Sequence, residues 1–167
     1  SFRRARFLNF LDPWQDATDV GYQLIHSLYA IGSGGFFGVG LGQSKQKALY
    51  IPEPYNDFIF SIIVEETGFL GGMLIIALFI VLIAAGINVA IKAKDMYGRL
   101  LSTGIISVVA IQLIINVAVV TGSMPVTGIP MPFISYGGTS MVFIMAAMGI
   151  LLNISKVSKS LEKNELA

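Results

Sequence analysis

Two long runs without a charged residue dominate the pattern of hydrophobic and polar positions along the chain. Residues 67–91 form the first run, and residues 100–155 form the second. A bilayer core needs about 20 apolar residues for one helical crossing. We therefore expect one membrane-spanning helix at about 69–91, while the second run has room for two.

The second run is interrupted at residues 121–138, which contain three prolines and four glycines. Proline removes a backbone donor and glycine weakens a helix, so a lipid-exposed helix cannot continue through this segment. Irregular backbone at membrane depth is tolerated only inside protein or beside water. This predicts helices at about 100–120 and 139–155, joined by an ordered extracellular loop at 121–138.

Basic residues indicate which ends of these helices face the cytoplasm. Lys92, Lys94 and Arg99 lie between the first two helices, and the tail at 156–167 carries three more lysines. Short segments rich in lysine and arginine tend to stay cytoplasmic. We therefore expect both segments to be cytoplasmic, and the 121–138 loop to lie outside.

Residues 1–66 precede the first predicted helix and hold twelve of the twenty-one charged side chains. A fourth crossing at 22–40 would place the three N-terminal arginines inside, but His26 and several glycines interrupt that stretch. We prefer a large extracellular loop with amphipathic and short helical pieces, starting in the membrane interface. Its glycine-rich part can offer N–H groups to phosphate, but it lacks P-loop spacing, which favours a tightly turning backbone.

Composition excludes several classes of function. The chain is 54% hydrophobic and only 13% charged, with a net charge of +1, no cysteine and one histidine. A disulfide framework and the usual zinc sites are therefore excluded. The net charge is too small to attract nucleic acid by long-range electrostatics. Because the chain begins with Ser1 rather than methionine, we expect it to be a piece of a longer protein.

Asp57 is the strongest candidate for chemistry in the extracellular segment. It stands between a proline-containing turn and the apolar run at 58–64. It can cap a helix that starts after it. Alternatively, a carboxylate beside an apolar run can have a raised pKa, which suits a general base. Lys45 and Lys47 either face lipid headgroups or neutralise an anionic lipid group such as a pyrophosphate.

Two further carboxylates follow at the outer end of the first predicted helix. If that helix extends outward, Asp57, Ser61, Glu65 and Gly68 share one face. Acidic residues near a helix start suit the helix dipole. Alternatively, Glu65 and Glu66 could hold Mg²⁺ or Mn²⁺ through oxygen ligands. The residues alone leave both interpretations open.

Several strings, in a fixed order along nearly the whole chain, resemble one family. They are GYQL at 21–24, SGG at 33–35, GVGLGQS at 38–44, QK at 46–47, PEPYNDFIF at 52–60, EE at 65–66, GF at 68–69, MPVTGIP at 124–130 and PFISYGGTS at 132–140. Together they resemble the C-terminal part of a SEDS protein (shape, elongation, division, sporulation) of the FtsW/RodA/SpoVE type. The first two strings favour the FtsW/SpoVE branch.

The resemblance implies an all-α polytopic fold of ten helices, of which this chain supplies the last three transmembrane helices and the large extracellular loop before them. It implies a peptidoglycan glycosyltransferase of the bacterial cytoplasmic membrane. Such an enzyme polymerises lipid II (undecaprenyl-pyrophosphate-linked disaccharide peptide) during cell division or sporulation, beside a class B penicillin-binding protein. Without the first seven helices, we expect the chain alone to be inactive.

The resemblance also implies roles for particular residues. The family's catalytic aspartate corresponds to Asp57, although Tyr55-Asn56 replaces the His-Thr that commonly precedes it. We expect Asp57 to be the general base, and positive charge or a divalent cation (Mg²⁺ or Mn²⁺) to stabilise the departing pyrophosphate. The expected substrate contacts are Lys47, Lys45, Glu53, Gln46, Ser135, Gly137, Gly138 and Ser140.

Two other functions are compatible with a membrane protein of this kind. A lipid II flippase is one, because broken helices and intramembrane charges often mark transport paths. A non-enzymatic division scaffold is the other. The predicted helices contain no charged residue, and the charges gather outside, which favours chemistry at the external face.

Overall fold

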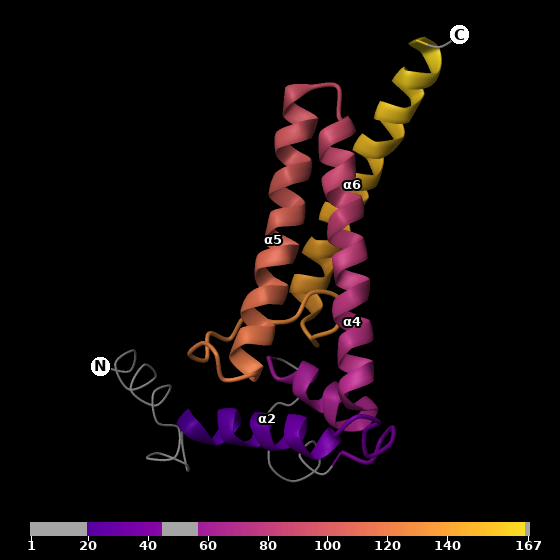
Figure 1. Cartoon of the computed structure of the whole chain (residues 1–167). Helices are drawn as coiled ribbons and strands as arrows, with labels where there is room; N and C mark the ends of the chain where they lie inside the picture. The colour runs from indigo at the N-terminus through magenta and orange to yellow at the C-terminus, as the bar shows by residue number, and fades with distance from the viewer. Residues whose placement is uncertain (1–19, 45–56, 166–167) are drawn as a thin grey trace. The chain divides into compact units, whose positions relative to one another are not determined.

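The computed structural model describes residues 20–44 and 57–165, and all regular structure in these ranges is helical (Figure 1). The helices are α2 (Val20–Gly34), α4 (Ile59–Lys92), α5 (Met96–Val120) and α6 (Gly138–Glu165). Within the described ranges, α4, α5 and α6 are long and apolar enough to cross a membrane. The prediction of an all-α fold with three membrane spans is confirmed.

Two helices are longer than predicted. α4 begins at Ile59, because the apolar run after Asp57 is already helical. α6 continues to Glu165, through the segment predicted to be a tail. Residues 156–165 include three lysines and two glutamates, which favour helix.

Between Gly68 and Lys92, α4 contains no charged residue, and it exposes a row of apolar side chains. Leu74, Leu78 and Val81 are all more than half exposed. A helix that is apolar all round belongs in a membrane or a large protein core. The surroundings of α4 are therefore lipid or further helices.

α4 is broken at Gly68, whose backbone is not helical (φ 76°, ψ −176°). A positive φ favours glycine, because a side chain is strained there. The predicted common face of Asp57, Ser61, Glu65 and Gly68 is therefore interrupted. Ser61 and Glu65 are fully buried rather than aligned along an open stripe.

The chain divides into two compact units. Among the described residues, the first contains α2, the start of α4, the end of α5 and the loop up to Tyr136. The second contains the remaining parts of α4 and α5, the connection between them, and α6.

In the first unit, α2 is attached to the end of α5 by a buried hydrogen bond. The Ser27 hydroxyl, which is fully buried, donates to the Val120 carbonyl at 3.0 Å. The last carbonyls of a helix have no intrahelical partner, so Ser27 satisfies one that α5 leaves open. Leu24 and Ala30 are buried on the same helix.

The glycine-rich loop after α2 closes the break in α4 with backbone hydrogen bonds on both sides. Two loop N–H groups donate to the end of the first helical segment, and two loop carbonyls accept from the start of the second. These bonds are Val39 N to Glu65 O (3.0 Å), Gly40 N to Glu66 O (3.1 Å), Phe69 N to Gly35 O (2.8 Å) and Leu70 N to Phe36 O (3.3 Å). The backbone groups released by the break are thereby satisfied.

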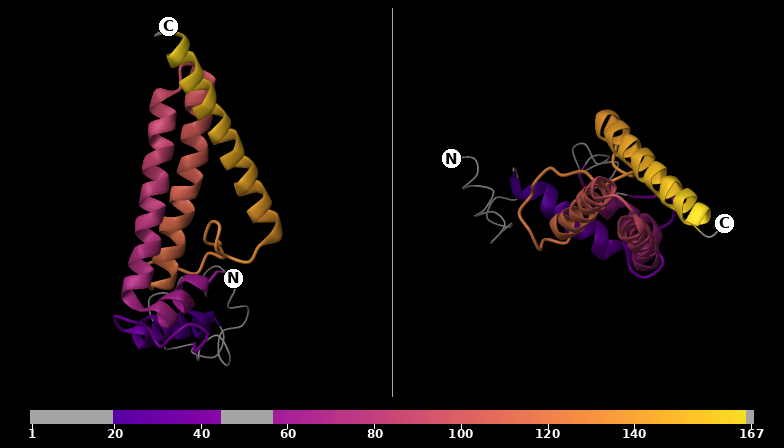
Figure 2. Two further views of the ribbon diagram at one scale, coloured as in Figure 1. Left: turned by 90° about the vertical axis from the view of Figure 1, so that its right-hand side faces the viewer. Right: turned by 90° about the horizontal axis from the view of Figure 1, so that it is seen from above.

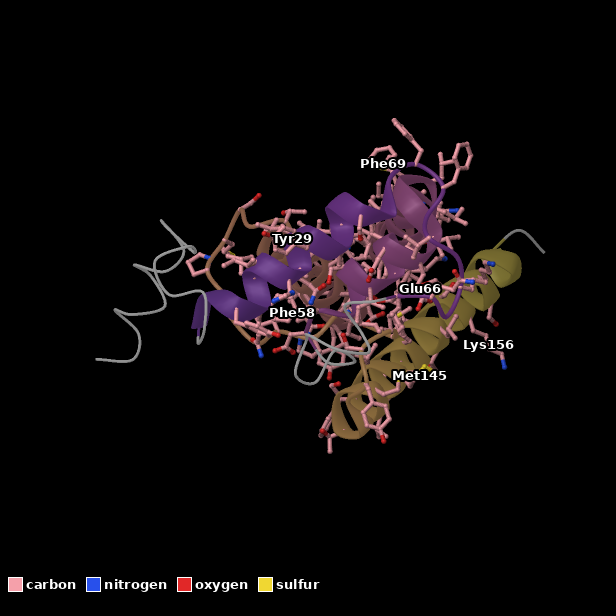
Figure 3. The ribbon with its side chains drawn as sticks, turned by 90° about the horizontal axis from the view of Figure 1, so that it is seen from below. Tyr29, Phe58, Glu66, Phe69, Met145 and Lys156 are labelled. Carbon is pink, nitrogen blue, oxygen red and sulfur yellow. The ribbon has the colours of Figure 1, made fainter. Side chains whose placement is uncertain are left out.

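Gly38 and Gly68 lie back to back at this junction. A Cβ atom on either glycine would overlap backbone atoms of the opposite segment. The phenyl rings of Phe36 and Phe69 meet edge to face beside it, with centroids 6.1 Å apart. Figure 3 shows Phe69 projecting from the surface there. These contacts agree with the interpretation of the loop as a tightly turning backbone.

In the second unit, α4 and α5 form an antiparallel hairpin (Figure 2). The carboxylate of Asp95 accepts a hydrogen bond from Gly98 N at 2.6 Å, so Asp95 is the N-cap of α5. Arg99 donates to the Ala93 carbonyl at 3.3 Å. Farther along the hairpin, Gly86 lets α4 approach the Ile106 side chain closely, as small residues do between membrane helices.

Candidate functional site

Asp57 lies in the turn immediately before α4, in the first unit. Phe58 and Phe60 follow it and are almost fully buried, at 2% and 4% exposure. Burying aromatic side chains of this size stabilises the turn by roughly 1.5–3 kcal/mol each. Asp57 itself is half-buried, so its carboxylate is at the edge of a fixed apolar cluster.

Asn116 of α5 connects the Asp57 turn to the 121–136 loop. Its side-chain amide donates to the Asp57 carbonyl at 2.8 Å and to the Ile129 carbonyl at 3.0 Å. Both amide hydrogens are therefore used, and the residue is only 1% exposed. Sequence reasoning missed Asn116. The available signal was a polar amide within a charge-free apolar helix, because such a group needs partners.

The 121–136 loop also places Gly128 beside the carboxylate of Asp57. A Cβ atom at Gly128 would lie 3.4 Å from Asp57 Oδ2. Gly128 has a φ of 73°, which a side chain would strain. Glycine therefore allows both the turn and the close approach of the loop to the carboxylate.

Ser135, a predicted substrate contact, closes a turn in the same loop. Its hydroxyl accepts a hydrogen bond from Met131 N at 2.7 Å, and its own N–H donates to Met131 O at 3.1 Å. Both residues are buried. Phe133, between them, has a φ of 63°, an uncommon conformation for a bulky residue. The predicted contact with substrate stays a prediction.

Three other predicted contacts, Gly137, Gly138 and Ser140, belong to the second unit and begin α6. The Ser140 hydroxyl donates to Gly137 O at 3.0 Å, and Met141 N donates to the same carbonyl at 2.9 Å. These bonds form the first turn of the helix. The role of the three residues toward substrate stays a prediction.

The two glutamates beside the break in α4 differ in environment. Glu65 is 2% exposed, and its Oε2 accepts a short hydrogen bond from the Ser44 hydroxyl. Glu66 is half-buried. Within residues 20–44 and 57–165, no three histidine, cysteine, aspartate or glutamate side chains gather as metal ligands. The divalent cation stays a prediction.

Four predicted substrate contacts lie outside the described residues. They are Lys45, Gln46, Lys47 and Glu53. The structure therefore brings together Asp57, Asn116 and the Gly128 loop, and it leaves the predicted pyrophosphate-binding lysines as sequence predictions.

The helices and the sequence define a multi-pass membrane protein of a bacterial cell-cycle class. Residues 1–160 match the model of the FtsW, RodA and SpoVE family, described as cell cycle protein. The chain belongs to this family, as the resemblance indicated.

Relatives from several bacteria are similar over nearly the whole chain. The stage V sporulation protein E of Bacillus subtilis is 54% identical over 95% of this chain and 43% of its own length. A probable peptidoglycan glycosyltransferase FtsW of Geobacter sp. is 48% identical over 93% of this chain and 42% of its own. The B. subtilis protein of the same name is 47% identical over 98% and 41%. The chain thus spans about two fifths of the length of these relatives.

Two solved structures share the fold. One concerns the structural coordination of polymerization and crosslinking by a peptidoglycan synthase complex. It is 29% identical, with a TM-score of 0.77 over 94% of this chain and 42% of the other. The second is an aspartate-to-alanine mutant of the rod shape determining protein RodA of Thermus thermophilus. It is 32% identical, with a TM-score of 0.60 over 78% of this chain and 39% of the other.

Proposed function

We propose that the complete protein carrying this sequence is a peptidoglycan glycosyltransferase that polymerises lipid II into glycan strands. The observation that carries the proposal is the half-buried carboxylate of Asp57, on a turn fixed by Asn116 and beside the Gly128 loop. The relatives named as probable peptidoglycan glycosyltransferases support the same reaction.

In this proposal, Asp57 removes the proton from the 4-hydroxyl of the acceptor sugar. The hydroxyl oxygen then attacks the anomeric carbon of the donor, and the bond to undecaprenyl pyrophosphate breaks. Attack from the face opposite the leaving group inverts the anomeric centre, as in inverting glycoside chemistry. A positioned general base contributes typically about 10²–10⁴-fold to such a rate.

The departing pyrophosphate carries negative charge, which positive groups stabilise. Lys47 and Lys45 are the proposed partners, with Gln46 and Glu53 beside them. A bound Mg²⁺ or Mn²⁺ would supply the same charge stabilisation. Ser135, Gly137, Gly138 and Ser140 are the proposed contacts to the rest of the substrate.

Asn116 is a positioning residue in this scheme. It does not touch the reacting atoms, but its amide holds the backbone carbonyl of Asp57 and that of Ile129 together. The position of the carboxylate relative to the loop therefore depends on Asn116. Small displacements of a catalytic group have large effects on rate.

A class B penicillin-binding protein is the proposed partner, because glycan strands must be crosslinked after polymerisation. The similar structure described as coordinating polymerization and crosslinking is itself a synthase complex. This similarity supports the proposal that the protein works within such an assembly.

The test is Asp57→Asn in the complete protein, reconstituted with fluorescent lipid II. We expect polymer on a gel to fall by at least about 10²-fold, with membrane insertion unchanged. Wild-type polymer yield from the variant would remove Asp57 from the mechanism. Movement of labelled lipid II between leaflets without polymer from the wild type would support the flippase instead. A polymer-deficient variant that still recruits its partner but cannot sustain growth would argue against a scaffold.

A further inference from the structure

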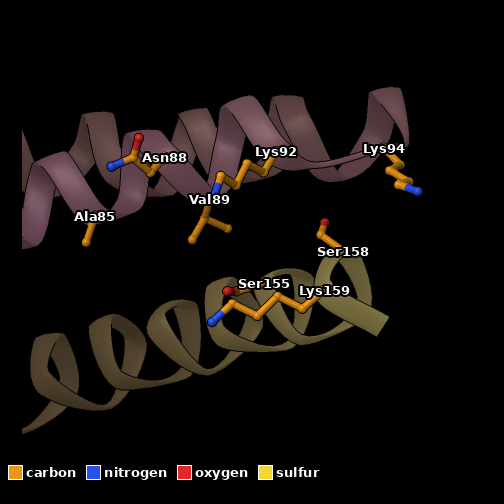
Figure 4. Close-up of a pocket in the computed structure, with 8 residues that line it drawn as sticks. All are labelled: Ala85, Asn88, Val89, Lys92, Lys94, Ser155, Ser158 and Lys159. Atoms are coloured by element: carbon orange, nitrogen blue, oxygen red, sulfur yellow. The ribbon is translucent and has the colours of Figure 1, made fainter. Parts of the chain in front are cut away.

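The second unit contains a cavity of about 580 Å³ between α4 and α6, at the ends predicted to be cytoplasmic (Figure 4). Three of its lining residues are lysines. The full lining is Ala85, Asn88, Val89, Lys92, Lys94, Ser155, Ser158 and Lys159. The proposed reaction at the external face uses none of these residues.

The lining provides positive charge and hydrogen-bond donors. Lys92 and Lys159 come from opposite helices, and Lys94 comes from the connection after α4. In Figure 4, Lys92 folds back along α4 toward Val89, and Lys159 runs along α6 toward Ser155. Both ammonium groups therefore lie beside the cavity instead of extending past the helix ends.

None of the described residues that line this cavity is acidic. Asn88, Ser155 and Ser158 add an amide and two hydroxyl groups, and Ser158 is 9% exposed. Ammonium groups, hydroxyls and an amide together suit a ligand with several anionic oxygens, such as a phosphate.

The polarity of the lining changes along α4. Ala85 and Val89 lie toward the middle of the helix, while Lys92 ends it. Apolar side chains toward the bilayer, beside lysines that originate at the cytoplasmic end, match a molecule with a charged head and an apolar body. Basic pockets between transmembrane helices on the cytoplasmic side bind anionic lipid headgroups in this way.

We propose that this cavity binds the phosphate headgroup of an anionic phospholipid from the cytoplasmic leaflet. Lys92 and Lys159 hold the phosphate from two sides, and Ser155 and Ser158 donate hydrogen bonds to its oxygens. The basic residues here then do more than set membrane orientation. Orientation requires only that they lie on one side, whereas binding requires that they converge on one cavity.

The test uses the complete protein in nanodiscs of phosphatidylcholine with increasing phosphatidylglycerol. Native mass spectrometry counts the retained phosphatidylglycerol on wild type and on the double variant Lys92→Gln/Lys159→Gln. Each lysine near an anionic lipid surface is worth about fivefold in binding, so we expect affinity to fall by about 25-fold. Lys156→Gln is the matched control for Lys159→Gln. It removes the same charge from the same helix, at a residue outside the cavity lining, and should change retention little.

The single variants Lys156→Gln and Lys159→Gln are compared directly. An equal loss of retained phosphatidylglycerol from both would overturn the proposal, because it would reflect overall charge alone. A third measurement separates the lipid from a soluble anion. Inorganic phosphate at millimolar concentration should not displace phosphatidylglycerol. Displacement that depends on Lys92 and Lys159 would assign the site to a soluble phosphate and overturn the lipid assignment. Accessibility labelling of the α4–α5 connection confirms that the variants keep the wild-type orientation.

Discussion

Replacing Asn116 tests whether α5 positions the proposed general base. Asn116→Leu removes the amide that donates to the Asp57 and Ile129 carbonyls. Asn116→Asp keeps the shape of the side chain but puts a carboxylate oxygen opposite two carbonyl oxygens. We expect both variants to lower kcat for lipid II polymerisation, with the KM for lipid II nearly unchanged.

The expected magnitude follows from the two hydrogen bonds. Each contributes about 0.5–1.5 kcal/mol net, and each carbonyl that loses its donor costs up to about 1–3 kcal/mol. If about 1–3 kcal/mol of this total is added to the activation free energy because Asp57 is displaced, the rate falls about five- to 150-fold. The larger effect is expected for Asn116→Asp, because like partial charges face each other.

The assay is single-turnover polymerisation by the complete protein, with thermal unfolding measured in parallel. Gln112→Leu is the control, because it removes a similar amide one turn earlier on the same helix. It should change the melting temperature more than kcat. If Asn116→Leu polymerises at the wild-type rate, or loses activity only as much as Gln112→Leu does, the positioning role is refuted.

Three further outcomes are expected. Gly68→Ala should destabilise the protein by more than about 1 kcal/mol, because φ is positive and the Gly38 backbone fills the space. Its control is Gly32→Ala, whose added Cβ meets no atom within 4 Å and which should be neutral or stabilising by up to about 1 kcal/mol. Similar melting curves for the two variants would contradict the packing at Gly68. Ser27→Ala should cost about 1–3 kcal/mol, since the Val120 carbonyl loses its donor, and an unchanged unfolding midpoint would show the bond to be unimportant. Treatment with EDTA should lower polymerisation and Mg²⁺ should restore it, while full activity after chelation would exclude the divalent cation.

The membrane spans were predictable because their signal is local and additive. Hydropathy and the absence of charge located α4, α5 and α6, and the prolines of the 121–138 segment located the loop. The break in α4 was not predictable, because Gly68 follows Glu65, Glu66 and Thr67, and no local signal there separates a broken helix from one that simply extends outward. The break depends on hydrogen bonds to the backbone of residues 35–40, which are distant from Gly68 in the sequence.

The site was predictable only in part. Asp57 stood out as a carboxylate beside an apolar run, and the resemblance to the family pointed to the same residue. The pairing of Asp57 with Asn116 and Gly128 depends on a fold that brings residues distant in sequence together, and no local pattern encodes it. Ser135 and Ser140 stay predicted substrate contacts, and the local turns that their hydroxyls form were not anticipated from the sequence.

The break at Gly68 separates the membrane-spanning part of α4 from the segment that carries the proposed base. From Phe69 to Lys92, α4 is roughly 36 Å long at 1.5 Å per residue, slightly more than the ~30 Å hydrocarbon core. Beyond the break, the segment that leads to Asp57 leaves the axis of the following helix (Figure 1). A helix without the break would instead carry the proposed base outward along its axis, away from the lipid that tethers the proposed substrate.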